Sequence, residues 1–277
     1  MTRPLPTYHD LAEPDRSGIL AQVQAQHARV AARLAAVRHV VAVASGKGGV
    51  GKSYIAASLA RRLGSAGHAV GLLDADLTGP TAPRLSGAAR PPVRPSDGSV
   101  QPAVTADGVR VFSAEFLAAP GEPVRWREPE GDAFVWRGTL EAGAVREMLA
   151  DVAWGELDLL LVDLPPGPAR LADLHGLVPG LRGVLAVTIP SLESLDAVRR
   201  ALLLARDRGV PLLGVIENLV EHACPNCGQR HPAFEGDAGA RLSAEFGVPL
   251  LAHLPFRPTD PELDRLAAAV WAAVERS

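Results

Sequence analysis

Short apolar runs alternate with amphipathic stretches along most of the chain. Apolar runs occur at 40–44, 69–74, 157–163, 183–189, 211–217 and 249–254, and stretches with helical periodicity occur at 17–38, 54–63, 139–151, 192–208, 238–246 and 261–275. Apolar strands that alternate with amphipathic helices are typical of a mostly parallel sheet covered by helices on both faces. The pattern therefore predicts a doubly wound α/β fold.

Residues 80–129 interrupt this alternation. The segment contains nine prolines and several glycines, and it predicts an irregular excursion with one short strand near 109–113. Residues 1–16 are polar and contain prolines, so we expect little regular structure there. The helix expected at 17–38 has an apolar stripe and a candidate cap in Ser17, which favours packing against the domain that follows.

A glycine-rich stretch joins the first apolar run to the helix expected at 54–63. It comprises Gly46, Lys47, Gly48, Gly49, Val50, Gly51, Lys52 and Ser53. This order fits the phosphate-loop pattern, in which glycines let backbone N–H groups wrap a phosphate at a helix N-terminus. Lys52 would reach the β- and γ-phosphates, and the Ser53 hydroxyl would bind Mg²⁺. We therefore expect a nucleoside triphosphate site over Gly46 to Tyr54.

Lysine usage supports a specific role for this loop. The chain has 28 basic residues besides its histidines, and Lys47 and Lys52 are its two lysines. A composition so rich in arginine keeps lysine where a compact, flexible ammonium is needed. A simple phosphate loop does not require Lys47, so this residue could act as a charge-stabilising finger, including across a dimer interface.

Acidic and amide side chains follow the expected strands. Asp74 and Asp76 come at the end of the strand at 69–74, Asp163 closes the strand at 157–163, and Asn218 follows the strand at 211–217. Ligands of such sheets bind at the carboxyl ends of the strands. Asp163 is thus a candidate for the Mg²⁺ shell, through water, and Asp76 for orienting the attacking water. The alternative for Asp163 is a simple turn or cap role, and the alternative for Asp76 is a helix N-cap.

Composition narrows the class of protein. The chain has 277 residues, 47% of them hydrophobic, with a net charge of −3. That charge gives no global reason to expect nucleic-acid binding, and no apolar run reaches the roughly 18 residues needed to span a bilayer. Two cysteines cannot form a disulfide framework. We therefore expect a cytoplasmic protein without a nucleic-acid or membrane partner.

The glycine loop, with its extra Lys47, resembles the deviant Walker A loop of the MinD/ParA/nitrogenase-iron-protein class of dimeric ATPases. Further stretches resemble the Mrp/ApbC family of iron–sulfur cluster carrier ATPases. These stretches are 71–81, Trp136-Arg137-Gly138, 151–158, 162–167, Glu217-Asn218 and Cys224-Pro225-Asn226-Cys227-Gly228. The resemblance runs from about residue 39 to the C-terminus, which implies an N-terminal extension over 1–38 and a P-loop ATPase domain over 39–277 with a cysteine segment at 218–236.

The resemblance implies a homodimer that binds ATP and Mg²⁺ and carries a [4Fe–4S] cluster between its subunits for delivery to apoproteins. Cys224 and Cys227 match the family's cluster ligands, and two chains would supply the four thiolates that such a cluster needs. By the same resemblance Lys47 would reach the partner's nucleotide and Asn218 would contact the adenine. Asp76 would serve a hydrolysis that is slow and coupled to transfer, and Asp163 would support Mg²⁺.

Other interpretations of the cysteines remain open. His222 and His231 flank them, so a Cys₂His₂ zinc site within one chain is an alternative. A redox dithiol is another, although the usual strand-to-helix context is missing. The overall alternatives are a MinD/ParA-like spatial-organisation ATPase acting on membrane or DNA, and a zinc-binding regulatory ATPase.

The sequence departs from the family pattern at several positions. The bulky Tyr54 follows Ser53 where the family usually has a small hydroxyl residue. The family's P-P-G-T-G-D reads Pro165-Pro166-Gly167-Pro168-Ala169-Arg170, so a hydroxyl, a glycine and an acid are lost and a proline and a cation gained. This segment would couple the nucleotide to the dimer, so the change bears on hydrolysis and switching more than on binding. The extra N-terminal domain or four-cysteine segment of many relatives is also missing.

Overall fold

The structure, a computed structural model, describes residues 19–91, 99–118, 122, 133–167, 169–178 and 180–277. The helices are α2 (Ile19–Leu34), α3 (Lys52–Ser65), α4 (Ala82–Ser86), α5 (Ala133–Asp151), α6 (Ala169–Leu177), α7 (Leu192–Asp207), α8 (Ala238–Phe246) and α9 (Asp260–Arg276), with the 3₁₀ turn η1 (Ala114–Leu117). The strands are β1 (Val37–Ser45), β2 (Val70–Asp74), β3 (Ala103–Val104), β4 (Arg110–Ser113), β5 (Leu157–Asp163), β6 (Leu181–Thr188), β7 (Leu212–Glu217), β8 (Glu221–Ala223), β9 (Arg230–Pro232) and β10 (Leu250–His253).

The main sheet confirms the predicted doubly wound fold. Its eight strands follow the order β10-β7-β6-β1-β5-β2-β4-β3, and every neighbouring pair is parallel except β3 with β4. Because β1 lies near the middle, the loop that follows it opens at the centre of the carboxyl edge. The ends of β2 and β5 lie side by side there, with Asp74 in register with Asp163.

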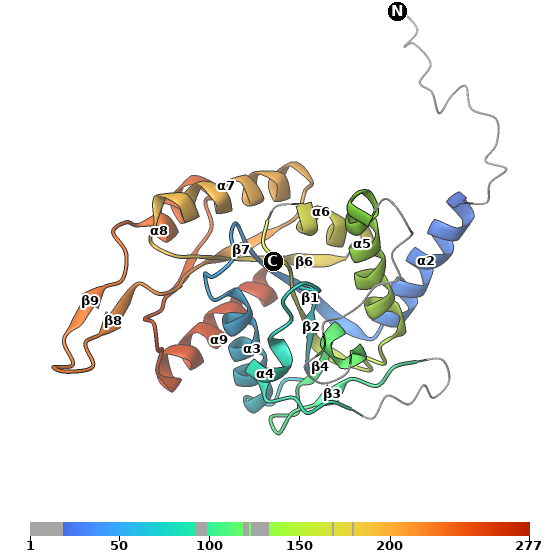
Figure 1. Ribbon diagram of the computed structural model, residues 1–277, viewed down its shortest axis with the longest axis horizontal. Helices are drawn as coiled ribbons and strands as arrows, with labels where there is room; N and C mark the ends of the chain where they lie inside the picture. The colour runs from blue at the N-terminus through green and yellow to red at the C-terminus, as the bar shows by residue number, and fades with distance from the viewer. Residues whose placement is uncertain (1–18, 92–98, 119–121, 123–132, 168, 179) are drawn as a thin grey trace, which may run out of the picture.

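Helices cover both faces of the sheet (Figure 1). Successive β1 residues are buried on opposite faces: Val40 and Ala42 pack with α2, α5, α6, α7 and α8, whereas Val41 and Val43 pack with α3 and α9. This period-two alternation is what a strand buried on both faces requires. Two apolar layers therefore hold the sheet, and the phosphate loop emerges between them.

The N-terminal helix is shorter than the expected 17–38. α2 ends at Leu34, and Val37 pairs with Leu157 as the first residue of β1. Residues 37 and 38 therefore belong to the strand β1 and not to the helix. Hydrogen bonding to β5 outweighs the helical spacing of the apolar residues that predicted a helix as far as residue 38. Val30 and Leu34 are buried in the core against α5, as expected of a helix packed on the domain. The candidate cap Ser17 lies outside the described residues.

The structure also differs from the sequence prediction in the number and the bounds of several elements. The excursion at 80–129 contains α4, β3 and η1 besides the expected strand, and α5 begins at Ala133 instead of residue 139. α6 follows β5 directly and was not expected, because nine residues are too few for a clear helical period. The bounds of β5 and α8 are those predicted.

The cysteine segment forms an antiparallel hairpin of β8 and β9, for which the sequence predicted no strands. The hairpin projects from the body of the molecule beside β7 and α9 (Figure 1). Among the described residues, no helix is long and apolar enough to cross a membrane.

A matched pair of substitutions on α2 tests whether this helix belongs to the core. Val30 is fully buried, whereas Val23 on the same helix is 38% exposed. Val30→Ala should lower the free energy of unfolding by about 2 kcal/mol, because it removes buried methyl groups and leaves a cavity. Val23→Ala should change it by less than about 0.5 kcal/mol. Urea unfolding measures both, and equal effects would mean that α2 does not share the core.

Candidate functional site

The phosphate loop joins the end of β1 to the first turn of α3. Gly49 and Gly51 have positive φ angles of 80° and 83°, which glycine adopts without the steric cost of a Cβ. A Cβ on Gly46 would lie 2.2 Å from the backbone of Ala197 in α7, so this helix packs directly on the loop. A hollow of about 340 Å³ lies in front of the loop and the N-terminus of α3. The geometry suits a bound anion.

Lys52 and Asp163 form a buried ion pair behind this hollow. The Lys52 ammonium contacts Asp163 Oδ1 and lies 3.4 Å from Ser53 Oγ. Burial raises the pKa of Asp163, and the charge of Lys52 opposes that rise. The second oxygen, Asp163 Oδ2, is buried without a hydrogen-bond partner among the described residues.

These residues fit a magnesium ion. Mg²⁺ takes hard oxygen ligands and keeps several waters. The Ser53 hydroxyl lines the hollow, and the unsatisfied Asp163 Oδ2 is a second such oxygen, buried behind it. Ser53 would hold the ion directly and Asp163 through water, and the ion would supply charge neutralisation of a bound triphosphate.

Asp74 organises the segment that faces the phosphate loop. Its carboxylate accepts backbone N–H bonds from Thr81 and Ala82 at 2.9 and 3.0 Å, and from Asp76 at 3.2 Å. Burial raises the pKa of Asp74 to about 7, with a further contribution from the neighbouring charge of Asp163. The sequence placed Asp74 at a strand end but gave no sign of this anchoring role, which depends on the path of residues 76–82.

Asp76 forms a turn at the edge of the hollow in front of the phosphate loop. Its Oδ1 accepts hydrogen bonds from the Thr78 backbone and hydroxyl at 3.3 and 2.8 Å and from the Gly79 N–H at 3.2 Å. The carboxylate therefore stabilises a turn, whereas the N-cap of the next helix, α4, is Thr81. It also lines the hollow in front of the phosphate loop, so the turn holds it where it could order a water.

Lys47 lies on the other side of the loop, towards α7. Its ammonium is 3.4 Å from Ser191 Oγ, which also caps α7 by accepting the Ser194 N–H at 3.2 Å. Within one chain the two lysines thus have different surroundings. Lys52 is held in a buried ion pair, whereas Lys47 is directed to a helix cap.

Asn218 supports the phosphate loop from behind. Its side-chain amide donates to the Val50 carbonyl at 3.0 Å, and its side chain is buried. A Cβ on Gly51 would lie 2.3 Å from the Asn218 amide nitrogen, so the contact also requires glycine at 51. Tyr54 points outward and lines the hollow with 36% of its surface exposed.

The two cysteines occupy the turn of the β8–β9 hairpin. The Cys224 N–H donates to the Gln229 carbonyl and the Gly228 N–H to the Cys224 carbonyl, both at 2.8 Å. Backbone N–H groups of Cys227 and Asn226 donate to the Cys224 sulfur and lower the pKa of its thiol. Hydrogen bonds of this kind stabilise thiolates. The turn is therefore prepared for a thiophilic metal, and its exposure allows a second chain to approach.

The histidines of the zinc alternative flank the cysteines without joining them. The rings of His222 and His231 face each other across the hairpin, with centroids 5.9 Å apart. In the described part of the chain, no group of three or more histidine, cysteine or acidic side chains is placed to hold a metal. The Cys₂His₂ arrangement is thus not formed within the described chain.

Comparisons with known proteins agree on a family. The family model ParA, described as NUBPL iron-transfer P-loop NTPase, matches residues 36–272. The chain is 36% identical over 243 residues to an iron-sulfur cluster carrier protein of Saccharolobus solfataricus, covering 87% of this chain and 79% of that protein. It is 40% identical over 240 residues to the cytosolic Fe-S cluster assembly factor NUBP2 of Bos taurus, covering 84% and 83%.

Solved structures give the same fold. A nucleotide-binding protein in complex with ADP from Archaeoglobus fulgidus aligns with a TM-score of 0.67 and 31% identity, covering 88% of this chain and 92% of that one. The septum site-determining protein MinD of Pyrococcus horikoshii, complexed with Mg-ADP, aligns with a TM-score of 0.53 over 86% and 95% of the two chains. Its 20% identity bears on the fold alone.

The raised pKa of Asp74 gives a pH dependence with a defined sign. Between about pH 4 and about pH 7 the folded chain holds a proton on Asp74 that the unfolded chain releases. The free energy of unfolding therefore falls as the pH rises through this window. Asp74→Asn, which still accepts hydrogen bonds, should reduce the fall between about pH 5 and about pH 7.5 by about 2 kcal/mol in urea unfolding.

Asp107→Asn is the control for this experiment. Hydrogen bonding and charge from Arg61 lower the pKa of Asp107, so this carboxyl titrates below the window and the variant should keep the wild-type slope. An unchanged slope in Asp74→Asn would contradict the assignment.

Proposed function

The chain belongs to the ParA family of NUBPL-type iron-transfer P-loop NTPases, and from that premise we propose that it is an ATP-dependent carrier of iron–sulfur clusters. In this proposal two copies of the chain hold one [4Fe–4S] cluster between them and deliver it to apoproteins. The observation that carries the proposal is the Cys224–Cys227 turn, whose backbone N–H groups favour a thiolate on a hairpin that offers two thiols where a cluster needs four.

The nucleotide half of the proposal assigns ATP and Mg²⁺ to the phosphate loop. Lys52 moves from Asp163 to the β- and γ-phosphates, and the freed carboxylate supports the magnesium shell together with Ser53. Asp76 orders the attacking water from its turn. Lys47 leaves Ser191 and reaches the nucleotide of the partner chain. Hydrolysis is slow and coupled to transfer of the cluster.

Asn218 has a modified role in this proposal. Its amide already contacts Val50, so it supports the loop in the absence of nucleotide and would reach the adenine only by changing partner. The proposal places the protein in the cytoplasm, because two of its relatives are named cytosolic Fe-S cluster assembly factors. Its partners are a second copy and apoproteins, without nucleic acid or membrane.

The C-terminal helix α9 packs into the core. The apolar stripe of α9, including Leu266 and Val270, is buried against the sheet. Core packing accounts for these apolar side chains, so they are not a membrane-binding face. The spatial-organisation alternative therefore has no specific contact in its favour among the described residues.

Anaerobic reconstitution with iron and sulfide tests the cargo. We expect about four iron atoms per dimer, with the visible absorbance of a [4Fe–4S] cluster. Cys224→Ala or Cys227→Ala should abolish this cluster while ADP binding survives. His222→Ala is the matched control, because it removes a zinc ligand of the alternative site but no cluster ligand. One zinc per chain that is lost in His222→Ala would contradict the proposal.

The two lysines test the nucleotide site. Lys52→Met should weaken ADP binding at least about tenfold, because it removes a charge that phosphates require. Lys47→Met should leave ADP affinity within about twofold and lower ATP turnover at least about tenfold, because its charge acts only in the dimer. Calorimetric ADP titration and phosphate release measure the two effects. Unchanged ADP affinity in Lys52→Met would overturn the loop assignment.

A further inference from the structure

The segment after Asp163 is fixed to the centre of the sheet. The Leu164 N–H donates to the Val43 carbonyl at 3.1 Å, and the Gly167 N–H donates to the Ser45 carbonyl at 3.0 Å. Between these anchors, Pro165 and Pro166 have restricted φ angles and no N–H to exchange for another partner. The start of the segment thus moves with β1, which carries the phosphate loop.

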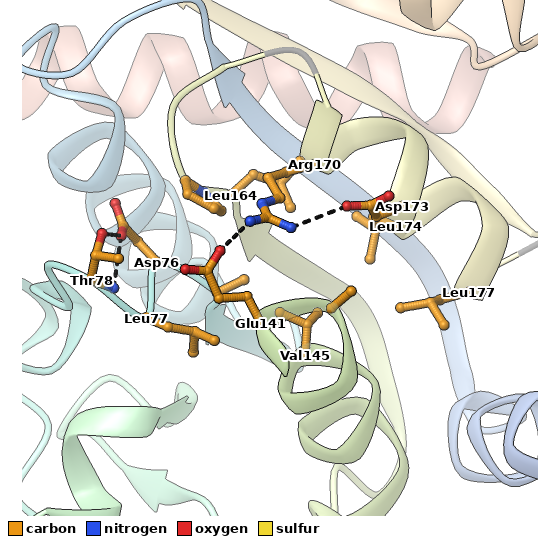
Figure 2. A pocket seen from close by; sticks show the side chains of 13 residues that line it. Asp76, Leu77, Thr78, Glu141, Val145, Leu164, Arg170, Asp173, Leu174 and Leu177 are labelled. Carbon is orange, nitrogen blue, oxygen red and sulfur yellow. Dashed lines mark hydrogen bonds and ion pairs between the residues drawn. The ribbon is translucent and has the colours of Figure 1, made fainter. Parts of the chain in front are cut away.

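The far end of the same segment is held by Arg170. Its guanidinium forms an ion pair with Glu141 of α5 and lies 3.3 Å from Asp173 on its own helix, α6. Figure 2 shows the arginine between the two carboxylates, with Glu141 reaching up from α5. The side chains of Arg170 and Glu141 are only 25% and 18% exposed, so water screens this pair less than a surface pair.

The ion pair between Arg170 and Glu141 also borders the turn formed by Asp76 and Thr78, which faces the phosphate loop. Arg170 and Glu141 line a small hollow of about 30 Å³ together with Asp76, Thr78 and Leu164. In Figure 2 the turn made by Asp76 and Thr78 lies on one side of Glu141 and Arg170 on the other. A shift of the segment after Asp163 would therefore disturb the pair and the wall against which the Asp76 turn rests.

Arg170 does not face the phosphates directly. The hollow in front of the phosphate loop is lined by Asp76 and Pro166, among others, and Arg170 is not part of its lining. The guanidinium is turned to Glu141 and Asp173. Its charge consequently acts on the position of the segment and not on the nucleotide.

We propose that Arg170 and Glu141 are positioning residues that hold the segment after Asp163 against α5 and thereby limit the rate of ATP hydrolysis. This inference rests on the proposed ATPase function. The segment is tied to β1 at one end and to α5 at the other, so an adjustment to a bound triphosphate requires the half-buried pair to separate. Separation gives up a charge-assisted contact at a half-buried position, which raises the barrier.

Glu141→Gln tests the pair with almost no change in shape. We expect kcat for ATP hydrolysis to rise about fivefold while KM and the ADP dissociation constant stay within about twofold. Arg170→Lys keeps the charge and one contact, so its kcat should stay within about twofold of wild type. A fall in kcat in Glu141→Gln, or no change, would overturn the inference.

Two controls separate this effect from a general loss of charge. Glu245→Gln breaks another contact between helices, where Arg199 Nε lies 2.8 Å from the carboxylate on α8, far along the chain from the site. Asp173→Asn removes the more exposed partner of Arg170 and keeps Glu141. Both variants should hydrolyse ATP at the wild-type rate, and a fivefold rise in either would also overturn the inference.

Hydrogen exchange without nucleotide separates failure of the inference from failure of the proposed function. In Glu141→Gln the amides of α6 should exchange at least about threefold faster than in wild type, because the helix has lost its tie to α5. Unchanged exchange overturns the inference whatever the ATPase result. Faster exchange, in a protein whose wild type releases no phosphate from ATP, would show that the pair holds α6 but that the proposed ATPase function is wrong.

Discussion

The buried ion pair between Lys52 and Asp163 is the constraint on which the carboxyl edge of the sheet depends. Three ionisable groups, Lys52, Asp163 and Asp74, are almost completely removed from water there. Burying one charge is tolerable when an opposite charge lies beside it, but the third group has no such partner. Asp74 responds with a raised pKa and with backbone hydrogen bonds from the segment at 76–82. The arrangement of Lys52, Asp163 and Asp74 thus fixes the ends of β2 and β5 beside the phosphate loop.

Much of this edge could be predicted from local sequence. The order of glycines and lysines identifies the phosphate loop, and the apolar run closed by Asp163 gives β5 with the observed bounds. These features are short and contiguous, so their chemistry can be recognised without a fold. The mostly parallel sheet follows in the same way from the alternation of strands and helices.

The remaining features depend on contacts between distant positions. The Asn218 amide reaches the carbonyl of Val50, 168 residues earlier in the chain, and Glu141 meets Arg170 across 29 residues. The position of Asn218 after a strand indicates a site residue but not its contact with Val50, and Glu141 does not look unusual in its own segment. The β8–β9 hairpin was missed because its strands have three residues each and exposed side chains, so they carry no apolar alternation. Val37 was misplaced because its pairing with Leu157, and not its spacing, decides its structure.

The cysteine hairpin is joined to the phosphate loop by a short and well-defined stretch of chain. Asn218 contacts Val50, and β8 begins at Glu221. Between them Leu219 has a positive φ of 58°, a conformation that non-glycine residues rarely adopt and that neighbouring contacts must enforce. Two hydrogen bonds, from Val220 to Leu254 and from Phe256 to Glu221, fix the base of the hairpin to the chain after β10. The stretch between Asn218 and the hairpin is therefore held by backbone hydrogen bonds to the chain after β10.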